Sequence, residues 1–371
     1  MCPYDLGVPG GVQTQVTGLA EELSLLGHAV VVIAPGAPGP PAGRPGPVRY
    51  ERAGKSIGIP VNGSRAPVCL DPRSVPATLR ALRRRQLDVV HVHEPMAPLV
   101  GLAAAALGPR PVVATFHRSG SDAAYLAEGR ALRPVARRLA AAFAVSEAAR
   151  ETAGDVLGLR DLPIVPNGVR LSAGGRRTSG APVPGSPGRI SGAPVPGPRR
   201  IAFVGRHEER KGLSVLIDAM AGLGGDVALD VVGDGPRTAA LRERTSGDNR
   251  ICWLGRLDDT SKAAVVAGSD LFVAPSLRGE SFGVVLLEAM AEGTPVVASD
   301  LPGHRAAAGG AAVFVPAGDA SALAGAISSL LGDEEARASL SAAGRARAEE
   351  CSMAAVARSY VELYCSVAGQ P

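Results

Sequence analysis

Short apolar runs alternate with amphipathic stretches along most of the chain. The apolar runs are rich in Val, Ile and Ala, which is typical of strands buried on both faces of a parallel sheet. We predict strands at residues 28–34, 89–93, 112–117, 141–145, 201–205, 227–232, 271–274, 296–298 and 313–315, with helices between them at, for example, 14–26, 214–221 and 321–331. This alternation predicts an α/β fold of doubly wound parallel sheets that bind ligands at the carboxyl ends of their strands.

A change in composition divides the chain. Residues 172–199 are mostly Gly, Pro, Ser and Arg, and a short repeat at 179–185 recurs at 191–197. We interpret this stretch as a linker between an N-terminal Rossmann-like domain at 1–171 and a second one at 200–350, followed by a C-terminal helix in 351–371. A length of 371 residues fits two domains.

The first residues do not show the strand that normally opens a Rossmann-like domain. Met1-Cys2-Pro3-Tyr4 leads almost directly to the glycine turn at residues 7–11. We expect the natural start to lie upstream and the first strand to be incomplete here.

Composition narrows the class of protein. The longest apolar stretch, 99–108, is too short to cross a bilayer, and no secretory signal opens the chain. The five cysteines form no Cys-x-x-Cys pair, which favours reduced thiols over a zinc site. A net charge of +4 without an aromatic-interleaved basic stripe gives no sign of nucleic-acid binding. We expect a cytoplasmic enzyme, with peripheral contact at the inner face of the plasma membrane left open.

Two carboxylates separated by seven residues form the strongest chemical motif. Glu280 lies in the turn Gly279-Glu280-Ser281-Phe282-Gly283, and Glu288 lies about two turns into the helix that follows. Carboxylates placed in this way can hold two hydroxylated parts of one elongated ligand, whereas a catalytic dyad would need both at one bond.

Glycine turns and cations after other strands complete a candidate site. Arg206 and Lys211 follow the strand at 201–205 and can reach a diphosphate, although two solvated surface cations are the simpler alternative. Gly233 lies in the loop after the strand at 227–232, which either lines a nucleotide pocket or is a simple turn, and Leu254 can place backbone groups beside a base. Gly11 opens a helix whose N-terminus favours phosphate or sugar oxygens, with a plain loop as the alternative. Because no Asp-x-Asp motif occurs, we expect no metal and no cofactor.

Three histidines and an arginine cluster mark the first half. His117 ends the strand at 112–117, and we favour a functional role for it over a structural one. His91 and His93 share one face of a strand and are better explained as buried hydrogen-bonding residues than as a metal pair. Arg80, Arg83 and Arg84 share a helix face that either binds anionic lipid headgroups or is simply solvated.

Together these motifs resemble family 4 of the retaining GT-B glycosyltransferases. The resemblance rests on the Glu280–Glu288 motif, on the segment from Gly205-Arg206 to Lys211-Gly212 and on Pro166-Asn167-Gly168-Val169. Within that family, the chain further resembles the actinobacterial phosphatidylinositol mannosyltransferase branch, in segments 2–4, 8–13, 62–64, 93–95 and 114–117. The family implies two Rossmann-like domains that face a deep interdomain cleft.

The resemblance also implies roles. The donor site would comprise Gly11, Arg206, Lys211, Gly233, Leu254, Glu280, Ser281, Phe282, Gly283, Val284 and Glu288. Within it, Arg206 and Lys211 would bind the diphosphate and Glu280 the sugar hydroxyls. The catalytic group would be His117, Glu280, Arg206 and Lys211, and the acceptor site Tyr4, Gln13, Asn62, Gly63, Ser64 and Glu94.

The implied reaction is retaining transfer of a hexose, mannose from GDP-mannose, to an inositol-type acceptor such as phosphatidylinositol. Val61 and Arg118 depart from the family pattern on the acceptor side. A UDP-sugar-dependent enzyme acting on a soluble cyclitol or natural product therefore remains an alternative. Two less favoured alternatives are a nucleotide-sugar epimerase and an inactive binding paralogue.

Overall fold

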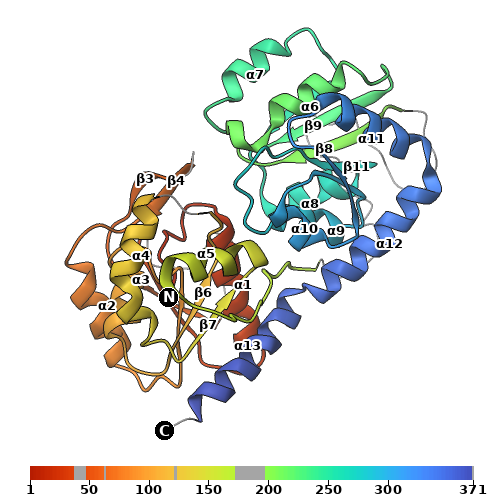
Figure 1. Cartoon of the computed structure of the whole chain (residues 1–371). Helices are drawn as coiled ribbons and strands as arrows, with labels where there is room; N and C mark the ends of the chain where they lie inside the picture. The colour runs from red at the N-terminus through yellow and green to blue at the C-terminus, as the bar shows by residue number, and fades with distance from the viewer. Residues whose placement is uncertain (37–46, 62–63, 121–122, 172–196, 370–371) are drawn as a thin grey trace. The chain divides into compact units, whose positions relative to one another are not determined.

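The computed structural model describes residues 1–36, 47–61, 64–120, 123–171 and 197–369 (Figure 1). The chain forms two compact units, one of residues 1–168 with 352–371 and one of residues 169–351. The predicted linker at 172–199 lies outside the described residues up to position 196. The two units are described separately below.

The described residues of the first unit form three small sheets. β5 (Val90–His93), β6 (Val112–Phe116) and β7 (Ala141–Ala144) form a parallel sheet in that order, which confirms the strands predicted there. β1 (Val31–Ala34) pairs in parallel with β2 (Arg49–Arg52) and is shorter than the predicted 28–34. β3 (Ile57–Val61) and β4 (Ser64–Val68) form an antiparallel hairpin that the apolar pattern did not predict.

The helices of this unit among the described residues are α1 (Gly11–Leu25), α2 (Ser74–Arg83), α3 (Val100–Leu107), α4 (Ala123–Ala136), α5 (Glu147–Leu157) and α13 (Met353–Ala368). α1 packs against α13, and their apolar faces share a core with Val113 and Phe143 of the sheet. A Cβ at Gly18 would lie 2.6 Å from Met353 Cε, so the missing side chain of Gly18 permits the close approach of the two helices. The long apolar stretch at 99–108 forms α3. Within the described residues, no helix is long and apolar enough to span a membrane.

The second unit is built on a six-stranded parallel sheet. Its strands are β8 (Arg199–Val204), β9 (Val227–Val232), β10 (Ile251–Gly255), β11 (Leu271–Ala274), β12 (Val296–Ser299) and β13 (Ala312–Val315). Their order, β10-β9-β8-β11-β12-β13, is the Rossmann order, and it reverses between β8 and β11. All predicted strands of this half are confirmed, and β10 is an additional one.

The helices of the second unit are η1 (Glu209–Lys211), α6 (Leu213–Met220), α7 (Thr238–Arg244), α8 (Asp259–Ala267), α9 (Val284–Ala291), α10 (Pro302–Ala308), α11 (Ala320–Gly332) and α12 (Glu334–Glu350). Leu216 of α6 and Ile327 of α11 pack against Ile201 and Leu229 of the sheet, and all four are fully buried. This core holds the loops after β8 and β11 at the same edge of the sheet, where parallel α/β sheets bind their ligands.

Candidate active site

The loops after β8 and β11 bring Lys211 and Glu280 together. Lys211 Nζ lies 2.6 Å from Glu280 Oε1, and Ser276 Oγ donates to the same oxygen at 3.0 Å. A Cβ at Gly212, whose φ is +66°, would lie 1.8 Å from the carbonyl oxygen of Pro275. Only glycine therefore lets the two loops meet, and this contact places Lys211 beside Glu280.

Glu280 is held as a carboxylate. Its side chain is 9% exposed, and burial by itself favours the neutral acid. The charge and hydrogen bond of Lys211, together with the charges of His304 and Arg210, outweigh burial and lower the pKa of Glu280 below its ordinary value. An ionised carboxylate at this position can accept hydrogen bonds from sugar hydroxyls.

A second carboxylate, Glu208, orders the cations of this site. Its Oε1 lies 3.1 Å from Arg206 Nε, its Oε2 accepts from Arg210 Nε at 2.9 Å, and its side chain is only 3% exposed. Arg210 Nη1 also lies 3.5 Å from Glu280 Oε1, so the predicted residues Arg206 and Lys211 belong to one charge network. The side chain of Arg206 remains 46% exposed and can reach a bound anion. Sequence reasoning missed Glu208 and Arg210, although both lie inside the quoted motif.

Backbone groups complete this edge of the second unit. Gly283 precedes α9 with a φ of +72° and supplies no side-chain cap. Its carbonyl accepts the Leu286 N–H, and the N–H groups of Val284 and Val285 lie before it at the start of the helix, where an anion is favoured. Ser281 and Val284 are half-buried next to it, whereas the side chain of Phe282 is buried and leaves only its backbone for a ligand. Gly233 has a φ of +124°, and a Cβ there would lie 1.9 Å from the Gly205 carbonyl oxygen. Leu254 is half-buried in β10.

Glu288 lies in α9 and pairs with a lysine that the sequence did not point to. Its Oε2 is 3.0 Å from Lys262 Nζ of α8, and its side chain is 31% exposed. Burial works to lower the pKa of Lys262, but Glu288 and Asp259 outweigh it and raise that pKa. The ammonium holds the carboxylate in place and leaves part of it open to a hydroxylated ligand.

His304 of α10 is a further residue that sequence reasoning missed. Its Nδ1 donates to the Ser299 carbonyl at 2.8 Å, and burial lowers its pKa against the opposing effect of Glu280. A Cβ at the preceding Gly303 would lie 2.0 Å from the Glu280 carbonyl oxygen. The start of α10 therefore supports the Glu280 loop with a neutral imidazole nearby.

In the first unit, His117 is joined to His93 and Glu94. His117 Nε2 lies 2.9 Å from His93 Nδ1, and Glu94 accepts the backbone N–H groups of both His117 and Arg118. Burial lowers the pKa of His117 to about 4, against a hydrogen bond with Asn167 that raises it. His117 is therefore neutral near pH 7 and can hydrogen-bond a hydroxyl without carrying a charge.

Glu94 has an unusual backbone and an unusual acidity. Its φ is +49°, in the left-handed region that non-glycine residues rarely adopt. Burial raises the pKa of its carboxyl to about 7, although the N–H groups of His117 and Arg118 oppose this shift. Strain and a perturbed pKa in one residue mark candidate functional sites.

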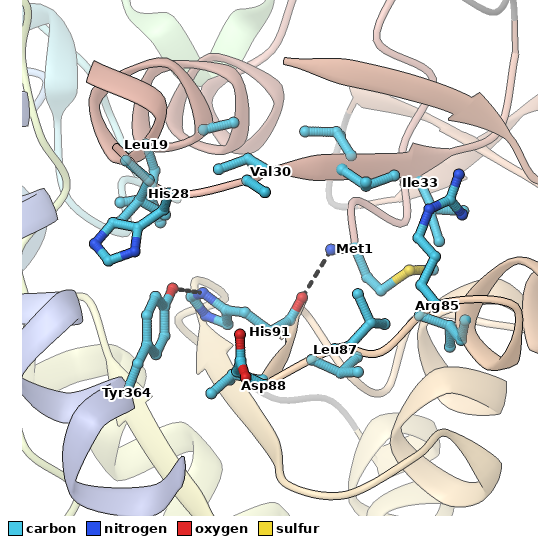
Figure 2. Close-up of a pocket in the computed structure, with 18 of the residues that line it drawn as sticks. Met1, Leu19, His28, Val30, Ile33, Arg85, Leu87, Asp88, His91 and Tyr364 are labelled. Atoms are coloured by element: carbon cyan, nitrogen blue, oxygen red, sulfur yellow. Dashed lines mark hydrogen bonds between the residues drawn. The ribbon is translucent and has the colours of Figure 1, made fainter. Parts of the chain in front are cut away.

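His91 and His93 are confirmed as hydrogen-bonding residues. His91 Nδ1 lies 2.6 Å from the Tyr364 hydroxyl (Figure 2), and its Nε2 lies 2.8 Å from Thr115 Oγ1, which in turn lies 2.8 Å from the Tyr360 hydroxyl. This network ties β5 and β6 to α13. In the described part of the chain, no group of three His, Cys, Asp or Glu side chains could hold a metal ion.

The other residues predicted for the acceptor site are Tyr4, Gln13 and the segment from Asn62 to Ser64. Tyr4 forms a bridge with Val68 and is half-buried, with a pKa that burial raises. Gln13 donates to the Val8 carbonyl at 3.0 Å, so its amide holds the glycine turn. Asn62 and Gly63 lie outside the described residues, as does the side chain of Ser64.

Two predictions concern the surface of the first unit. Gly11 at the start of α1 is exposed, and a Cβ there would meet no atom within 4 Å, so the space beside this glycine is open. Arg80, Arg83 and Arg84 are all exposed at the C-terminal end of α2, which ends at Arg83.

Two family models match the chain. Residues 9–173 match glycosyltransferase family 4, and residues 198–333 match the glycosyl transferases group 1. A phosphatidyl-myo-inositol mannosyltransferase of Mycobacterium leprae is 39% identical over 99% of this chain and 96% of its own length. The chain belongs to glycosyltransferase family 4. The expected family is therefore confirmed.

Other relatives and solved structures extend the comparison. The phosphatidyl-myo-inositol mannosyltransferase of Mycobacterium tuberculosis is 35% identical over 100% of this chain and 96% of its own length. A D-inositol 3-phosphate glycosyltransferase of Nocardia farcinica is 30% identical over 96% of this chain and 85% of its own length. The structure of Anabaena Alr3699/HepE in complex with UDP and glucose has a TM-score of 0.73 at 20% identity and covers 99% of this chain and 98% of its own. The fold is that of GT-B glycosyltransferases, with two Rossmann-like domains.

Proposed function

We propose that this glycosyltransferase moves mannose from GDP-mannose to an inositol-type acceptor such as phosphatidylinositol, with retention of configuration. The observation that carries the proposal is the 39% identity over 99% of the chain to a protein named for that activity. The charge network of the second unit supports the donor chemistry, because it combines cations for a diphosphate with an ionised carboxylate for hydroxyls.

We assign the donor to the second unit. Arg206 and Lys211 bind the diphosphate and stabilise its charge as it leaves. Lys211 can do this while it holds Glu280, because an ammonium group has three donors and this pair uses one. Glu280 binds the sugar hydroxyls, and Glu288 binds the ribose. These cations and the open N-terminus of α9 supply positive charge at the diphosphate, so the proposed reaction needs no metal and no cofactor.

We assign the acceptor to the first unit, near His117 and Glu94. The proposed step is a front-face displacement in which the acceptor hydroxyl forms a bond to the anomeric carbon as the bond to the diphosphate breaks. The leaving phosphate takes the hydroxyl proton, and neutral His117 hydrogen-bonds a sugar or acceptor hydroxyl.

A second candidate is transfer to a soluble inositol phosphate. The 30% identity to a D-inositol 3-phosphate glycosyltransferase over 96% of the chain favours it as the alternative. For the lipid acceptor, we propose that Arg80, Arg83 and Arg84 contact anionic headgroups at the inner face of the plasma membrane.

Calorimetric titration with GDP, UDP, GDP-mannose and UDP-N-acetylglucosamine in the presence of EDTA tests the donor. We expect GDP-selective binding that Arg206→Ala weakens about tenfold or more, since a charge-assisted hydrogen bond is lost. Arg358→Ala, at an exposed position of α13, is the matched control. UDP-selective binding would contradict the donor, and a requirement for added Mg²⁺ would contradict the metal-independent site.

The acceptor is tested by incubating labelled GDP-mannose with phosphatidylinositol vesicles or with inositol 3-phosphate. Label in the lipid fraction supports the first candidate, whereas label only in the soluble phosphate overturns it in favour of the second. Release of free mannose at the same rate with and without acceptor would contradict both.

A further inference from the structure

Arg210 joins the two loops of the second unit that carry the candidate donor site. It lies in η1, after β8, and its backbone carbonyl accepts the N–H of Leu277, in the loop after β11, at 2.8 Å. Its Nη1 lies 3.5 Å from both the Gly279 carbonyl oxygen and Glu280 Oε1. The backbone and the side chain of this one residue therefore both contact the segment that carries Glu280.

Glu208 holds the guanidinium of Arg210 through a different nitrogen. Glu208 Oε2 accepts from Arg210 Nε at 2.9 Å, and the Glu208 side chain is 3% exposed. The guanidinium thus spans two buried carboxylates, Glu208 from the loop after β8 and Glu280 from the loop after β11. A planar guanidinium can make both contacts at once through its rigid set of N–H donors, whereas an ammonium acts as a single point of charge.

The turn before Glu280 lies directly against the stem of this arginine. Gly279 has a φ of +76°, and a Cβ there would lie 3.8 Å from Arg210 Cδ. Side-chain-bearing residues rarely adopt that conformation, so the course of the chain over Arg210 depends on glycine. A displacement of Arg210 is therefore passed to Glu280, which is the next residue along the chain.

Lys211 is the closer cation to Glu280, but it has a second task. Its Nζ lies 2.6 Å from Glu280 Oε1, and in the proposed reaction the same ammonium also binds the diphosphate. Arg210 is anchored by the buried carboxylate of Glu208, so its place does not depend on the ligand. Arg210 can therefore keep the Glu280 turn fixed when a bound diphosphate draws on Lys211.

We propose that Arg210 is a positioning residue for the transferred sugar: held by Glu208, it fixes the turn that carries Glu280, and it does not bind the diphosphate. This inference rests on the proposed function, in which Glu280 binds the sugar hydroxyls. It divides the cations of the site by task. Arg206 and Lys211 set the affinity for the nucleotide diphosphate, and Arg210 sets the part of the affinity that the sugar adds.

Calorimetric titration of the full chain with GDP and with GDP-mannose separates the two tasks. The deciding quantity is the ratio of the two dissociation constants, because a group that binds only the diphosphate changes both constants equally. We expect Arg210→Met to shift this ratio about three- to tenfold against GDP-mannose and to change the GDP constant by less than about twofold, since about one hydrogen bond to the sugar is lost. The kcat for transfer should fall about tenfold or more, because the sugar is misplaced.

Two further variants separate this role from a loss of folding. Glu208→Gln/Arg210→Met removes the buried carboxylate together with its partner, and it should show the same shift of the ratio. Arg244→Met is the matched control in the same unit. Arg244 Nη2 lies 3.4 Å from Asp218 Oδ1 and donates to the Ser214 carbonyl at 3.1 Å, so this change also removes an arginine with an acidic and a backbone partner. It should leave the ratio and kcat unchanged.

The Glu280→Ala background shows whether Arg210 acts through Glu280. In that background, Arg210→Met should cause no further shift of the ratio. A further shift would overturn the inference, as would a loss of GDP affinity as large as the loss of GDP-mannose affinity.

Failure of the proposed function gives a different result. If the original protein selects UDP, the proposed donor is wrong, and the same ratio measured with UDP and UDP-N-acetylglucosamine decides the role of Arg210. Binding of no nucleotide by the original protein would overturn the proposed function and this inference together.

Discussion

The ion pair between Lys211 and Glu280 offers a direct test of the donor-side network, by the substitution Lys211→Met. Methionine keeps most of the volume of lysine and leaves the Glu280 carboxylate, 9% exposed, with Ser276 Oγ at 3.0 Å and Arg210 Nη1 at 3.5 Å. Removing one partner of a buried pair costs about 3–5 kcal/mol. Because Arg210 remains and the lysine is 19% exposed, we expect a loss of about 2–3 kcal/mol from the free energy of unfolding of the second unit.

Lys262→Met is the matched control, since it breaks a lysine–glutamate pair of similar length in the same unit. Glu288 is 31% exposed and can be hydrated after the change, so the expected loss is about 1 kcal/mol or less. Trp253 is the single tryptophan of the chain and lies in β10, so its fluorescence during urea denaturation reports on the unit that contains both pairs.

The difference in the free energy of unfolding between the original protein and Lys211→Met also depends on pH. The folded-state pKa of Glu280 is below its ordinary value of 4.5, so the stability it contributes is present above pH 4.5 and is lost as pH falls through the folded-state pKa. The gap between the original protein and Lys211→Met should therefore shrink on acidification below pH 4.5. The double variant Lys211→Met/Glu280→Gln should recover part of the loss, because no buried carboxylate is left unpaired. An equal loss for Lys262→Met, or a gap that stays constant down to pH 3, would refute the reasoning.

Three further predictions concern the first unit. Burial raises the pKa of Glu94 to about 7, so the stability that its protonated form contributes is present below pH 4.5 and is lost as pH rises through 7, by up to about 3 kcal/mol. Glu94→Gln should reduce the difference in stability between pH 5 and pH 8 measured by calorimetric scans, and an unchanged difference would contradict the raised pKa of Glu94. His93→Ala should lower kcat about tenfold or more with little change in donor affinity, because His93 Nδ1 orients His117 through its contact with Nε2 at 2.9 Å. His93→Gln should keep part of the kcat that His93→Ala loses, and an equal loss in both variants would argue for a purely structural role. Replacing Arg80, Arg83 and Arg84 with Ser should reduce flotation with phosphatidylinositol vesicles at low salt, whereas unchanged flotation would sink the membrane proposal.

The fold of the second unit was predictable because its signals are local. Apolar runs of four to six residues mark its strands, and glycines at 212, 233 and 283 mark the turns that leave them. The first unit was predicted less well. β1 is shorter than its apolar run, and the β3–β4 hairpin contains Gly58 and Pro60, which weaken a strand pattern.

The partners of the site residues could not be predicted in the same way. The sequence does not distinguish Glu208 from the other charged residues of its segment. The structure shows that Glu208 pairs with both Arg206 and Arg210. Gln13, predicted to border the acceptor, donates to the carbonyls of its own loop, a contact that its place in the sequence did not indicate. In each case, the deciding fact is the direction in which a side chain points, and sequence spacing does not contain it.

The sequence by itself determined the class of fold, the family and the residue types of the donor motif, because periodicity, glycine turns and the spacing from Glu280 to Glu288 are properties of neighbouring residues. Tertiary structure decided which charges pair and which side chains lie side by side. Lys211 and Glu280 are 69 positions apart, and His91 and Tyr364 are 273 apart. Contacts over such separations form only when strands pair and helices pack. Burial then lowers the pKa of His91 and raises that of Tyr364, whereas the cations around Glu280 lower its pKa against burial.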